Sequence, residues 1–323
     1  MRVLSGVQPS GTLHIGNYFG AIKQHLEDQN QHECFFFIAN YHTLTTVQDA
    51  AKLRQLTLDV AIDYLTLGLD PAKAALFRQS DIPEVTELAW ILSTVTGRGL
   101  LERAHSYKDK TARGIASSMG LFCYPVLMAA DILIYHSDLV PVGKDQVQHI
   151  EMTQDMAGYF NNTYGEVLRR PEPKLNETAI VPGIDGQKMS KSYGNTIDIF
   201  GDAKEMKKRI MSIKTDATPL EAPKDPDART EISLMKLFAT PEEHADWCSR
   251  YRAGGVGYGH AKTRLVELYE EWATPRREQR GKWVARPDDV EDILRDGAKR
   301  ARVVAEKVMH EVREACGIVR AKA

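Results

Sequence analysis

The sequence predicts an α/β protein with a doubly wound parallel sheet and a helical insertion, followed by an α-helical C-terminal domain. In the first half of the chain, short apolar runs alternate with helix-like segments, which is typical of parallel strands joined by helical crossovers. After about residue 200 the strand-like runs fade and helical periodicity replaces them. With 323 residues, the chain is long enough for two domains.

The expected strands are short and apolar. Arg2–Val7 carries β-branched residues and ends in a Gln-Pro-Ser-Gly turn. Residues 34–39, with the sequence CFFFIA, form a continuous apolar run, which is the pattern of a strand buried on both faces. Two further short strands are expected at residues 76–79 and 139–142.

Helices are expected between these strands. Residues 16–29 form the first, and residues 49–67 form the second, with Asp49 as its N-cap. A helix begins at residue 84, and another covers residues 145–159. The stretch 84–135 is longer than one crossover requires, so we expect inserted helices there. Residues 171–187 are rich in Pro and Gly and predict a linker with one short strand at residues 179–181.

The last third of the chain is expected to be helical. Residues 276–323 carry 13 Lys and Arg against 9 Asp and Glu, a bias that fits either a solvated helix surface or a patch facing RNA. We expect a catalytic domain over residues 1–187, a loop over 188–200 and a helical domain over 201–323. The helices predicted there cover residues 204–213, 232–238, 241–251, 261–272 and 288–316.

The composition excludes several classes of protein. The 42 Lys and Arg residues are balanced by 44 Asp and Glu residues, so the chain is not a generally basic DNA-binding protein. The four cysteines are far apart and no CxxC occurs, which argues against a zinc site, an iron–sulfur cluster and a disulfide scaffold. No apolar segment is long enough for a signal peptide or a membrane span, so we expect a cytoplasmic protein with no membrane partner.

The first motif that predicts chemistry is QPSGTLHIGN at residues 8–17, where the first strand turns into the first helix. Ligands of such sheets bind at the carboxyl ends of the strands, and the unpaired N–H groups of a helix N-terminus suit phosphate. Gly11 and Gly16 allow a nucleotide to approach the backbone, and His14 and Asn17 add side-chain donors. A plain strand–turn–helix junction without a ligand is the alternative.

The second motif is KMSKS at residues 188–192, directly after the linker. Two lysines and two hydroxyl groups on a loop suit a mobile clamp for a polyphosphate, because lysine is a flexible point charge. A solvated Lys/Ser loop without a ligand is the alternative.

The two motifs together resemble the class I aminoacyl-tRNA synthetases of the HIGH superfamily, with Asn17 in place of the second His of the HIGH motif. The blocks at residues 6–18 (GVQPSGTLHIGNY), 128–133 (MAADIL) and 140–149 (VPVGKDQVQH) resemble the bacterial tryptophanyl-tRNA synthetases. The resemblance implies a Rossmann-like catalytic domain and a C-terminal domain that binds the tRNA anticodon. It is weakest in the helical C-terminal third.

This resemblance implies roles for residues at both motifs. Gln8, Lys188 and Lys191 are implied to be catalytic, with Gln8 near the reacting centre and the lysines on the phosphates. The carboxylate of Asp145 is implied to accept hydrogen bonds from the ribose, and Lys110 to join the phosphate contacts. The residues implied to bind ATP are Gln8, Pro9, Ser10, Gly16, Asn17, Gly143, Lys144, Asp145, Ile180, Lys188, Met189, Ser190, Lys191 and Ser192.

The resemblance also implies a pocket for tryptophan. Tyr124, Met128 and Asp131 share a helix face if Pro125 opens that helix. Asp131 lies in an apolar run, where a buried carboxylate needs a partner that the indole N–H would supply. Core packing for Met128 and a helix-surface position for Asp131 are the alternatives. The implied pocket residues are Gly6, His42, Tyr124, Met128, Asp131 and Gln146, with Ile132, Val140 and Val142 as further apolar walls.

The implied reaction has two steps. Tryptophan reacts with ATP to form tryptophanyl adenylate and pyrophosphate, and the 3′-terminal adenosine of the cognate tRNA then accepts the amino acid. Mg²⁺ is expected to arrive with the ATP, and no dedicated metal site is expected. The family also implies a homodimer, with the insertion as its interface.

Three other functions compete with this interpretation. A tyrosyl-tRNA synthetase shares the fold and the motifs, but the sequences GNY at residues 16–18 and MAADIL at residues 128–133 argue against it. A small-molecule nucleotidyltransferase of the same superfamily would not need the helical C-terminal domain. A catalytically dead RNA-binding relative would not need an intact KMSKS motif and Gln8.

Overall fold

The computed structural model describes residues 1–104, 118–175 and 180–319. The chain divides into two compact units by its internal contacts. The sheet unit consists of residues 1–11, 25–176 and 286–323, and the helical unit consists of residues 12–24 and 177–285. Lys110 lies outside the described residues.

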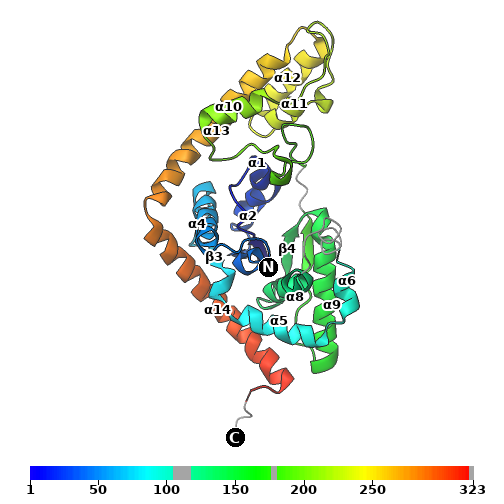
Figure 1. The fold of residues 1–323 in the computed structure, drawn as a ribbon, viewed down its shortest axis with the longest axis vertical. Coiled ribbons are helices and arrows are strands. Elements are labelled where there is room, and N and C mark those ends of the chain that lie inside the picture. The colour runs from blue at the N-terminus through cyan, green and yellow to red at the C-terminus, as the bar shows by residue number, and fades with distance from the viewer. Residues whose placement is uncertain (105–117, 176–179, 320–323) are drawn as a thin grey trace. The chain divides into compact units, whose positions relative to one another are not determined.

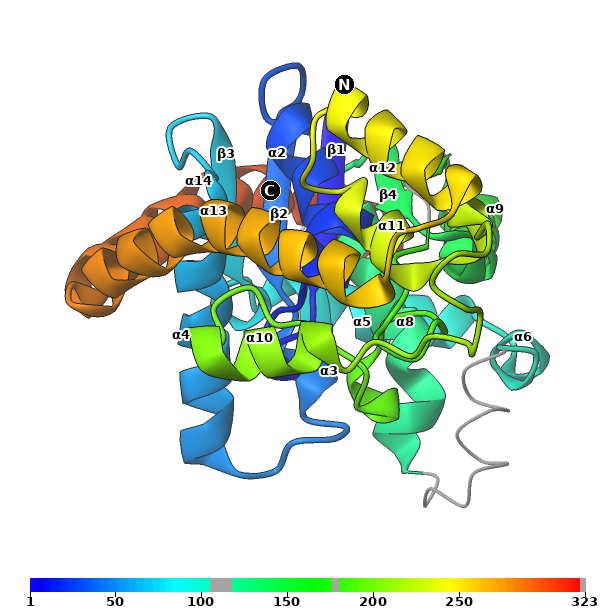
Figure 2. The ribbon, with the colours of Figure 1, turned by 90° about the horizontal axis from the view of Figure 1, so that it is seen from above.

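The sheet unit contains five parallel strands in the order β3-β2-β1-β4-β5. At the centre, Val3 pairs with Cys34 on one side and with Leu139 on the other. This arrangement confirms the predicted parallel sheet, of which Figure 2 shows β3, β2, β1 and β4 from left to right. The strands are β1 (Arg2–Val7), β2 (Glu33–Ile38), β3 (Ala74–Arg78), β4 (Leu139–Val142) and β5 (Glu172–Leu175).

Strand β5 was missed by the sequence analysis, which placed a linker there. Its sequence EPKL has no run of apolar residues, so it becomes a strand through pairing with β4, from Leu139↔Glu172 to Val142↔Leu175. The strand predicted at residues 179–181 is wrong for its described part. Ile180 and Val181 are not in a strand, and Pro182 forms only an isolated bridge with Lys188.

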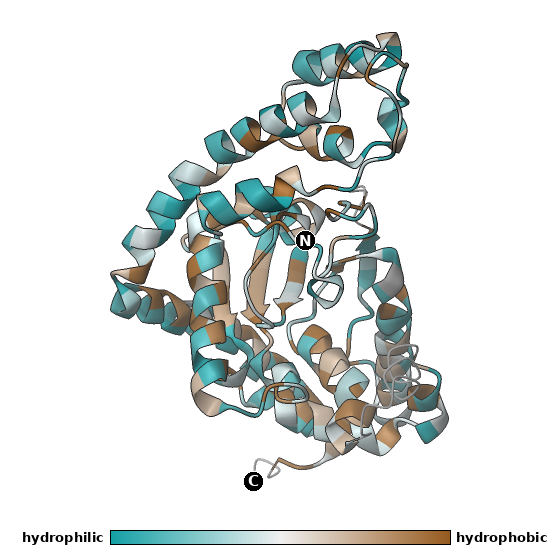
Figure 3. Ribbon diagram, turned by 45° about the horizontal axis from the view of Figure 1, so that its top comes forward, coloured by the Kyte–Doolittle hydropathy of each residue, from teal (hydrophilic) through white to brown (hydrophobic). Residues whose placement is uncertain are grey.

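Helices cover the sheet, and their apolar faces point toward it. Figure 3 shows the central strands in mostly hydrophobic colours, whereas the helices change between hydrophobic and hydrophilic residues along their length. The helices of this unit are α2 (Lys23–Asp28, which begins in the helical unit), α3 (Asn40–Thr43), α4 (Ala50–Leu67), α5 (Glu84–Val95), α6 (Arg98–Glu102), α8 (Met119–Leu133), α9 (Val147–Tyr164) and α14 (Pro287–Cys316). Short helical turns are η2 (Gln79–Asp81) and η3 (Lys144–Gln146).

Most of the predicted helices are present. Asp49 caps α4 as expected, and its side chain accepts a hydrogen bond from the Lys52 N–H at 2.9 Å. The predicted start of α8 at Pro125 is wrong, because Ser118 caps the helix and Pro125 lies inside it. Inside the helix, Pro125 removes one backbone donor and its ring crowds the carbonyl of Leu121. The helix continues because burial of the apolar side chains Leu121 and Val126 offsets this cost.

Helix α14 packs against β3 (Figures 1 and 2). Its apolar side chains recur every three or four residues, so they form one stripe along the helix. Arg300 donates to the Ala74 carbonyl at 2.6 Å, and Arg302 donates to Glu84 at 2.7 Å. These contacts place residues 286–323 in the sheet unit, which differs from the expected domain over 201–323.

The helical unit is built around an aromatic cluster. Phe19 contacts Phe238 at 5.4 Å between ring centroids, and Tyr18 contacts Trp272 at 5.1 Å. These contacts join the segment after the first motif to the C-terminal helices. The unit contains α1 (Ile15–Asn17), η1 (Tyr18–Ile22), η4 (Lys191–Tyr193), α10 (Ala203–Met211), η5 (Pro226–Ala228), α11 (Thr230–Met235), α12 (Pro241–Ala253) and α13 (Tyr258–Val284).

Helix α13 is longer than predicted, since it continues through Pro275. Among the helices of the described residues, none combines the length and the apolar character that a membrane crossing requires.

Candidate active site

A cavity of about 400 Å³ opens at the carboxyl ends of the central strands of the sheet unit. This is the edge at which parallel sheets bind their ligands. Its lining combines apolar walls with a few polar groups, as small-molecule sites do. The lining residues are Leu4, Ser5, Gly6, Gln8, Phe37, Ala39, His42, Thr45, Tyr124, Met128, Asp131, Ile132, Val140, Gln146 and His149.

The cavity brings together residues that the sequence analysis assigned to a tryptophan pocket. All six of those residues line it, together with Gln8 and two of the three further apolar residues. Tyr124, Met128 and Asp131 do share one face of α8, although Pro125 does not open the helix. Val142 is not among the described lining residues.

Asp131 already has protein partners. The carboxylate is 2% exposed, and its Oδ2 lies 2.8 Å from His42 Nε2. The amide of Gln79 donates to Oδ1 at 2.8 Å and to Oδ2 at 2.9 Å. Burial raises the pKa of Asp131, and the hydrogen bonds from His42 and Gln79 oppose that rise.

The sequence analysis expected the indole N–H of a ligand to be the partner of a buried Asp131, whereas the protein itself already supplies two partners, His42 and Gln79. His42 and Gln79 follow the paired strand ends Ile38 and Arg78, so the sheet carries both to the same place. The sequence analysis missed Gln79 because nothing in its local sequence indicates that this polar side chain is buried.

Tyr124 is coupled to a histidine that the sequence analysis did not assign. Its hydroxyl lies 2.6 Å from His149 Nε2, and burial raises the pKa of Tyr124 to about 12. His149 is the last residue of the block at residues 140–149, so this motif could have indicated His149 as a residue of the site. The pair holds a neutral phenol at the cavity, because the phenolate form would need a much higher pH.

Gly6 has a structural reason to be glycine. A Cβ atom there would lie 2.4 Å from the ring of Phe37, which is too close for a side chain. Glycine therefore lets the Phe37 ring pack directly against β1 in the wall of the cavity.

The helical unit brings the two sequence motifs together. Ile15 N–H donates to the Ile197 carbonyl at 2.9 Å, and Ile199 N–H donates to the Leu13 carbonyl at 3.0 Å. A Cβ on Gly16 would lie 3.3 Å from the Cβ of Met189, so the first motif packs closely on the KMSKS segment.

His14 lies at this junction. Burial, and secondly the positive charge of Lys191, lower its pKa to about 4, so the imidazole is neutral at neutral pH. The Asn17 side chain accepts a hydrogen bond from the His14 N–H at 3.0 Å. Asn17, which the resemblance implies to bind ATP, therefore caps the first helical turn.

Asn195 organises the KMSKS segment and was not predicted. It is 2% exposed, and its side-chain oxygen accepts from the Ser190 N–H at 2.8 Å. Its amide nitrogen donates to Asp185 at 2.8 Å and to the Lys188 carbonyl at 3.1 Å. One side chain thus joins three points of the loop and leaves the Lys188 side chain exposed.

The residues predicted for ATP are divided between the two units. Gln8, Pro9, Ser10, Gly143 and Lys144 belong to the sheet unit. Asp145 lies on η3, and its side chain is outside the described part. In the helical unit, Met189 is 4% exposed and Ile180 is 71% exposed, with Gly16, Asn17, Lys188, Ser190, Lys191 and Ser192 as the other members.

Comparisons with known proteins identify the family. The family model described as "tRNA synthetases class I (W and Y)" matches residues 1–272. The chain belongs to this family. A class I synthetase relative, the tryptophan–tRNA ligase of Rhodopirellula baltica, is 53% identical over 319 residues, covering 98% of this chain and 100% of that one.

Solved class I synthetases share the fold. The Campylobacter jejuni tryptophanyl-tRNA synthetase in complex with ADP and tryptophan has a TM-score of 0.93 and 51% identity, and covers 98% of this chain and 100% of that one. The Mycoplasma pneumoniae tryptophanyl-tRNA synthetase has a TM-score of 0.83 and 29% identity, with coverages of 98% and 97%. The predicted Rossmann-like fold with a helical C-terminal region is confirmed.

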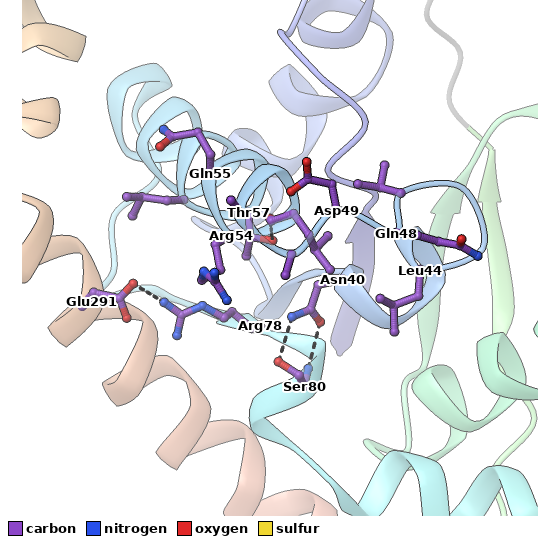
Figure 4. Close-up of a pocket in the computed structure, with 15 residues that line it drawn as sticks. Asn40, Leu44, Gln48, Asp49, Arg54, Gln55, Thr57, Arg78, Ser80 and Glu291 are labelled. Carbon is purple, nitrogen blue, oxygen red and sulfur yellow. Dashed lines mark hydrogen bonds and ion pairs between the residues drawn. The ribbon is translucent and has the colours of Figure 1, made fainter.

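A second cavity of this class I synthetase, of about 730 Å³, lies in the sheet unit beside α4 (Figure 4). None of the sequence-predicted site residues is among its described lining residues. Asn40 and Ser80 form two hydrogen bonds with each other there, and Arg78 pairs with Glu291 (Figure 4).

Proposed function

We infer that the protein is a tryptophan–tRNA ligase, which activates L-tryptophan with ATP and transfers it to the 3′-terminal adenosine of its tRNA. The observation that carries this conclusion is the cavity in which Asp131 stands among apolar walls. Relatives that are 51–53% identical over nearly the whole chain are named tryptophan–tRNA ligase, which supports the same conclusion.

The cavity suits an indole ring with a single donor. An indole N–H can only donate, and an ionised carboxylate can only accept, so Asp131 is assigned to that group. Met128, Ile132 and Val140 supply apolar walls. Tyr124 and Gln146 are assigned to the ammonium group of the amino acid.

Activation needs positioning and charge stabilisation rather than a protein nucleophile. The carboxylate of tryptophan attacks the α-phosphorus of ATP, and pyrophosphate leaves. Gln8 is assigned to the reacting centre, and Lys188 and Lys191 to the phosphates. Mg²⁺ enters as part of the Mg·ATP substrate. In the described part of the chain no group of His, Cys, Asp and Glu is arranged to hold a metal ion.

Further ATP contacts are assigned within each unit as the resemblance implies. In the sheet unit they come from Pro9, Ser10, Gly143, Lys144 and Asp145, and in the helical unit from Gly16, Asn17, Ile180, Met189, Ser190 and Ser192. The helices after residue 201 are assigned to the tRNA, with the anticodon as the part recognised. Their positive side chains would neutralise phosphates.

We also propose a cytoplasmic homodimer that associates through the insertion at residues 84–135. Two large apolar side chains of that region face solvent: Trp90 on α5 and Met119 on α8 are each 72% exposed. Contiguous apolar patches mark association surfaces, and we propose that these two side chains belong to one such patch.

The test of the activity is ATP–pyrophosphate exchange, measured with each of the twenty amino acids, with and without tRNA. We expect exchange with tryptophan alone. Exchange with tyrosine instead would identify a tyrosyl-tRNA synthetase. No exchange with any amino acid would identify an inactive relative and overturn the proposal.

A further inference from the structure

Gln79 lies directly behind the carboxylate that faces the cavity. It is the first residue of η2, immediately after β3, and it is 1% exposed. It is not among the described residues that line the cavity, whereas Asp131 is. Gln79 therefore acts on the pocket through Asp131.

The hydrogen bonds to Asp131 leave one acceptor position on a particular oxygen. A carboxylate offers about two positions on each oxygen. Oδ2 accepts from Gln79 at 2.9 Å and lies 2.8 Å from His42, so both of its positions are taken. Oδ1 accepts only from Gln79, at 2.8 Å, among the described residues, so it has room for one more donor.

The segments that hold Gln79 and His42 are joined to each other. The Gln79 Oε1 atom accepts from the Tyr41 N–H at 3.0 Å, which fixes the side-chain amide with its NH₂ group toward Asp131. Asn40 donates to the Ser80 hydroxyl at 2.7 Å, and the Ser80 N–H donates back to Asn40 at 3.1 Å (Figure 4). These bonds tie α3 to η2, so both partners of Asp131 share one support.

We propose that Gln79 is a positioning and specificity-determining residue: its amide orients the Asp131 carboxylate so that Oδ1 keeps one acceptor position for the N–H of the indole. This rests on the proposed function. A group that donates to both oxygens of a carboxylate prevents its rotation. Without Gln79, the contact with His42 at Oδ2 would be the one left to Asp131 among the described residues. The carboxylate could then turn about that contact or take up a proton, and the acceptor position for the indole N–H would be less well placed.

The first experiment measures exchange kinetics for Gln79→Met, which keeps the length and approximate volume of the side chain but removes the donor. Two substrates are compared: tryptophan, and an analogue in which sulfur replaces the indole nitrogen and the N–H is lost. We expect kcat/KM for tryptophan to fall by about 10–100-fold, as for loss of a hydrogen bond to a charged group. The kcat/KM for the analogue should fall much less, and the KM for ATP should not change.

Equal losses for tryptophan and the analogue, or no loss for either, would overturn the positioning role while leaving tryptophan activation intact. A wild-type protein that fails to activate tryptophan would instead overturn the proposed function.

Gln79→Glu gives an independent readout through its pH profile. Two carboxyl groups at this distance share one proton, and the introduced carboxyl group, when protonated, can donate to Asp131 as the amide does. We expect tryptophan activation by this variant to survive at low pH and to be lost as the pH rises, with wild type as the control. A pH profile parallel to that of wild type would contradict the proposal, even if Gln79→Met did not fold.

Discussion

At the scale of single residues, several polar side chains are buried where burial itself sets their charge. His25 is the clearest case in the sheet unit. It is 2% exposed, its ring stacks on Phe36 at 5.1 Å between centroids, and its Nδ1 lies 3.1 Å from the Tyr64 hydroxyl. Burial, and secondly the charge of Lys174, lower the pKa of His25 to about 4. The imidazole is therefore neutral in the folded protein.

This burial predicts a loss of stability in acid. Between pH 6.5, the ordinary pKa of histidine, and about pH 4, the unfolded chain binds a proton at His25 and the folded chain does not. The free energy of unfolding should therefore fall as the pH drops through this window, by up to about 3 kcal/mol from this group. Urea unfolding of wild type and His25→Gln at a series of pH values checks this.

The variant His25→Gln keeps a hydrogen-bonding side chain toward Tyr64 but cannot titrate. Its stability should depend less steeply on pH than that of wild type between pH 6.5 and 4. Identical slopes would show that His25 does not carry the effect.

At the scale of elements, α14 depends on one close backbone approach. A Cβ on Gly297 would lie 2.0 Å from the Leu76 carbonyl oxygen of β3. A backbone atom cannot move aside as the end of a flexible side chain can. The absence of a side chain at this position therefore sets how closely the helix lies on the strand.

We expect Gly297→Ala to destabilise the protein by about 1–3 kcal/mol or more, because it overpacks the contact between α14 and β3. Gly281→Ala is the matched control, since α13 leaves open space around Gly281. There, replacing glycine within a helix should stabilise by up to about 1 kcal/mol. Thermal unfolding of both variants tests this, and a Gly297→Ala variant as stable as Gly281→Ala would contradict it.

At the scale of the whole molecule, the proposed dimer makes a prediction about size in solution. The monomer mass is 36.2 kDa. Light scattering during size exclusion at micromolar concentration should give about twice that mass for wild type and a monomer for Trp90→Glu, because a buried charge at an association surface is costly.

Val303→Glu is the control for this experiment. Val303 is 71% exposed, much as Trp90 is, but it lies on α14, outside the insertion. The Val303→Glu variant should therefore have the same mass in solution as wild type. A monomeric wild type, or dissociation by both variants alike, would count against an interface in the insertion.

The sequence by itself determined the features that local patterns encode. The apolar run of β2 marks a strand, and Asp49 marks the start of α4, since both depend on residues within one element. The motifs at residues 8–17 and 188–192 pointed to the family for the same reason. The apolar run around Asp131 also indicated its burial, and the 2% exposure confirms it.

The tertiary structure alone decided what depends on residues far apart in the chain. Asp131 meets Gln79 across 52 positions and His42 across 89, and no local pattern specifies such meetings. Strand β5 exists because β4 offers unpaired backbone groups. The assignment of α14 to the sheet unit follows from its contact with β3. In each case the free energy comes from burial and hydrogen bonds between distant segments, which form only when the chain has folded.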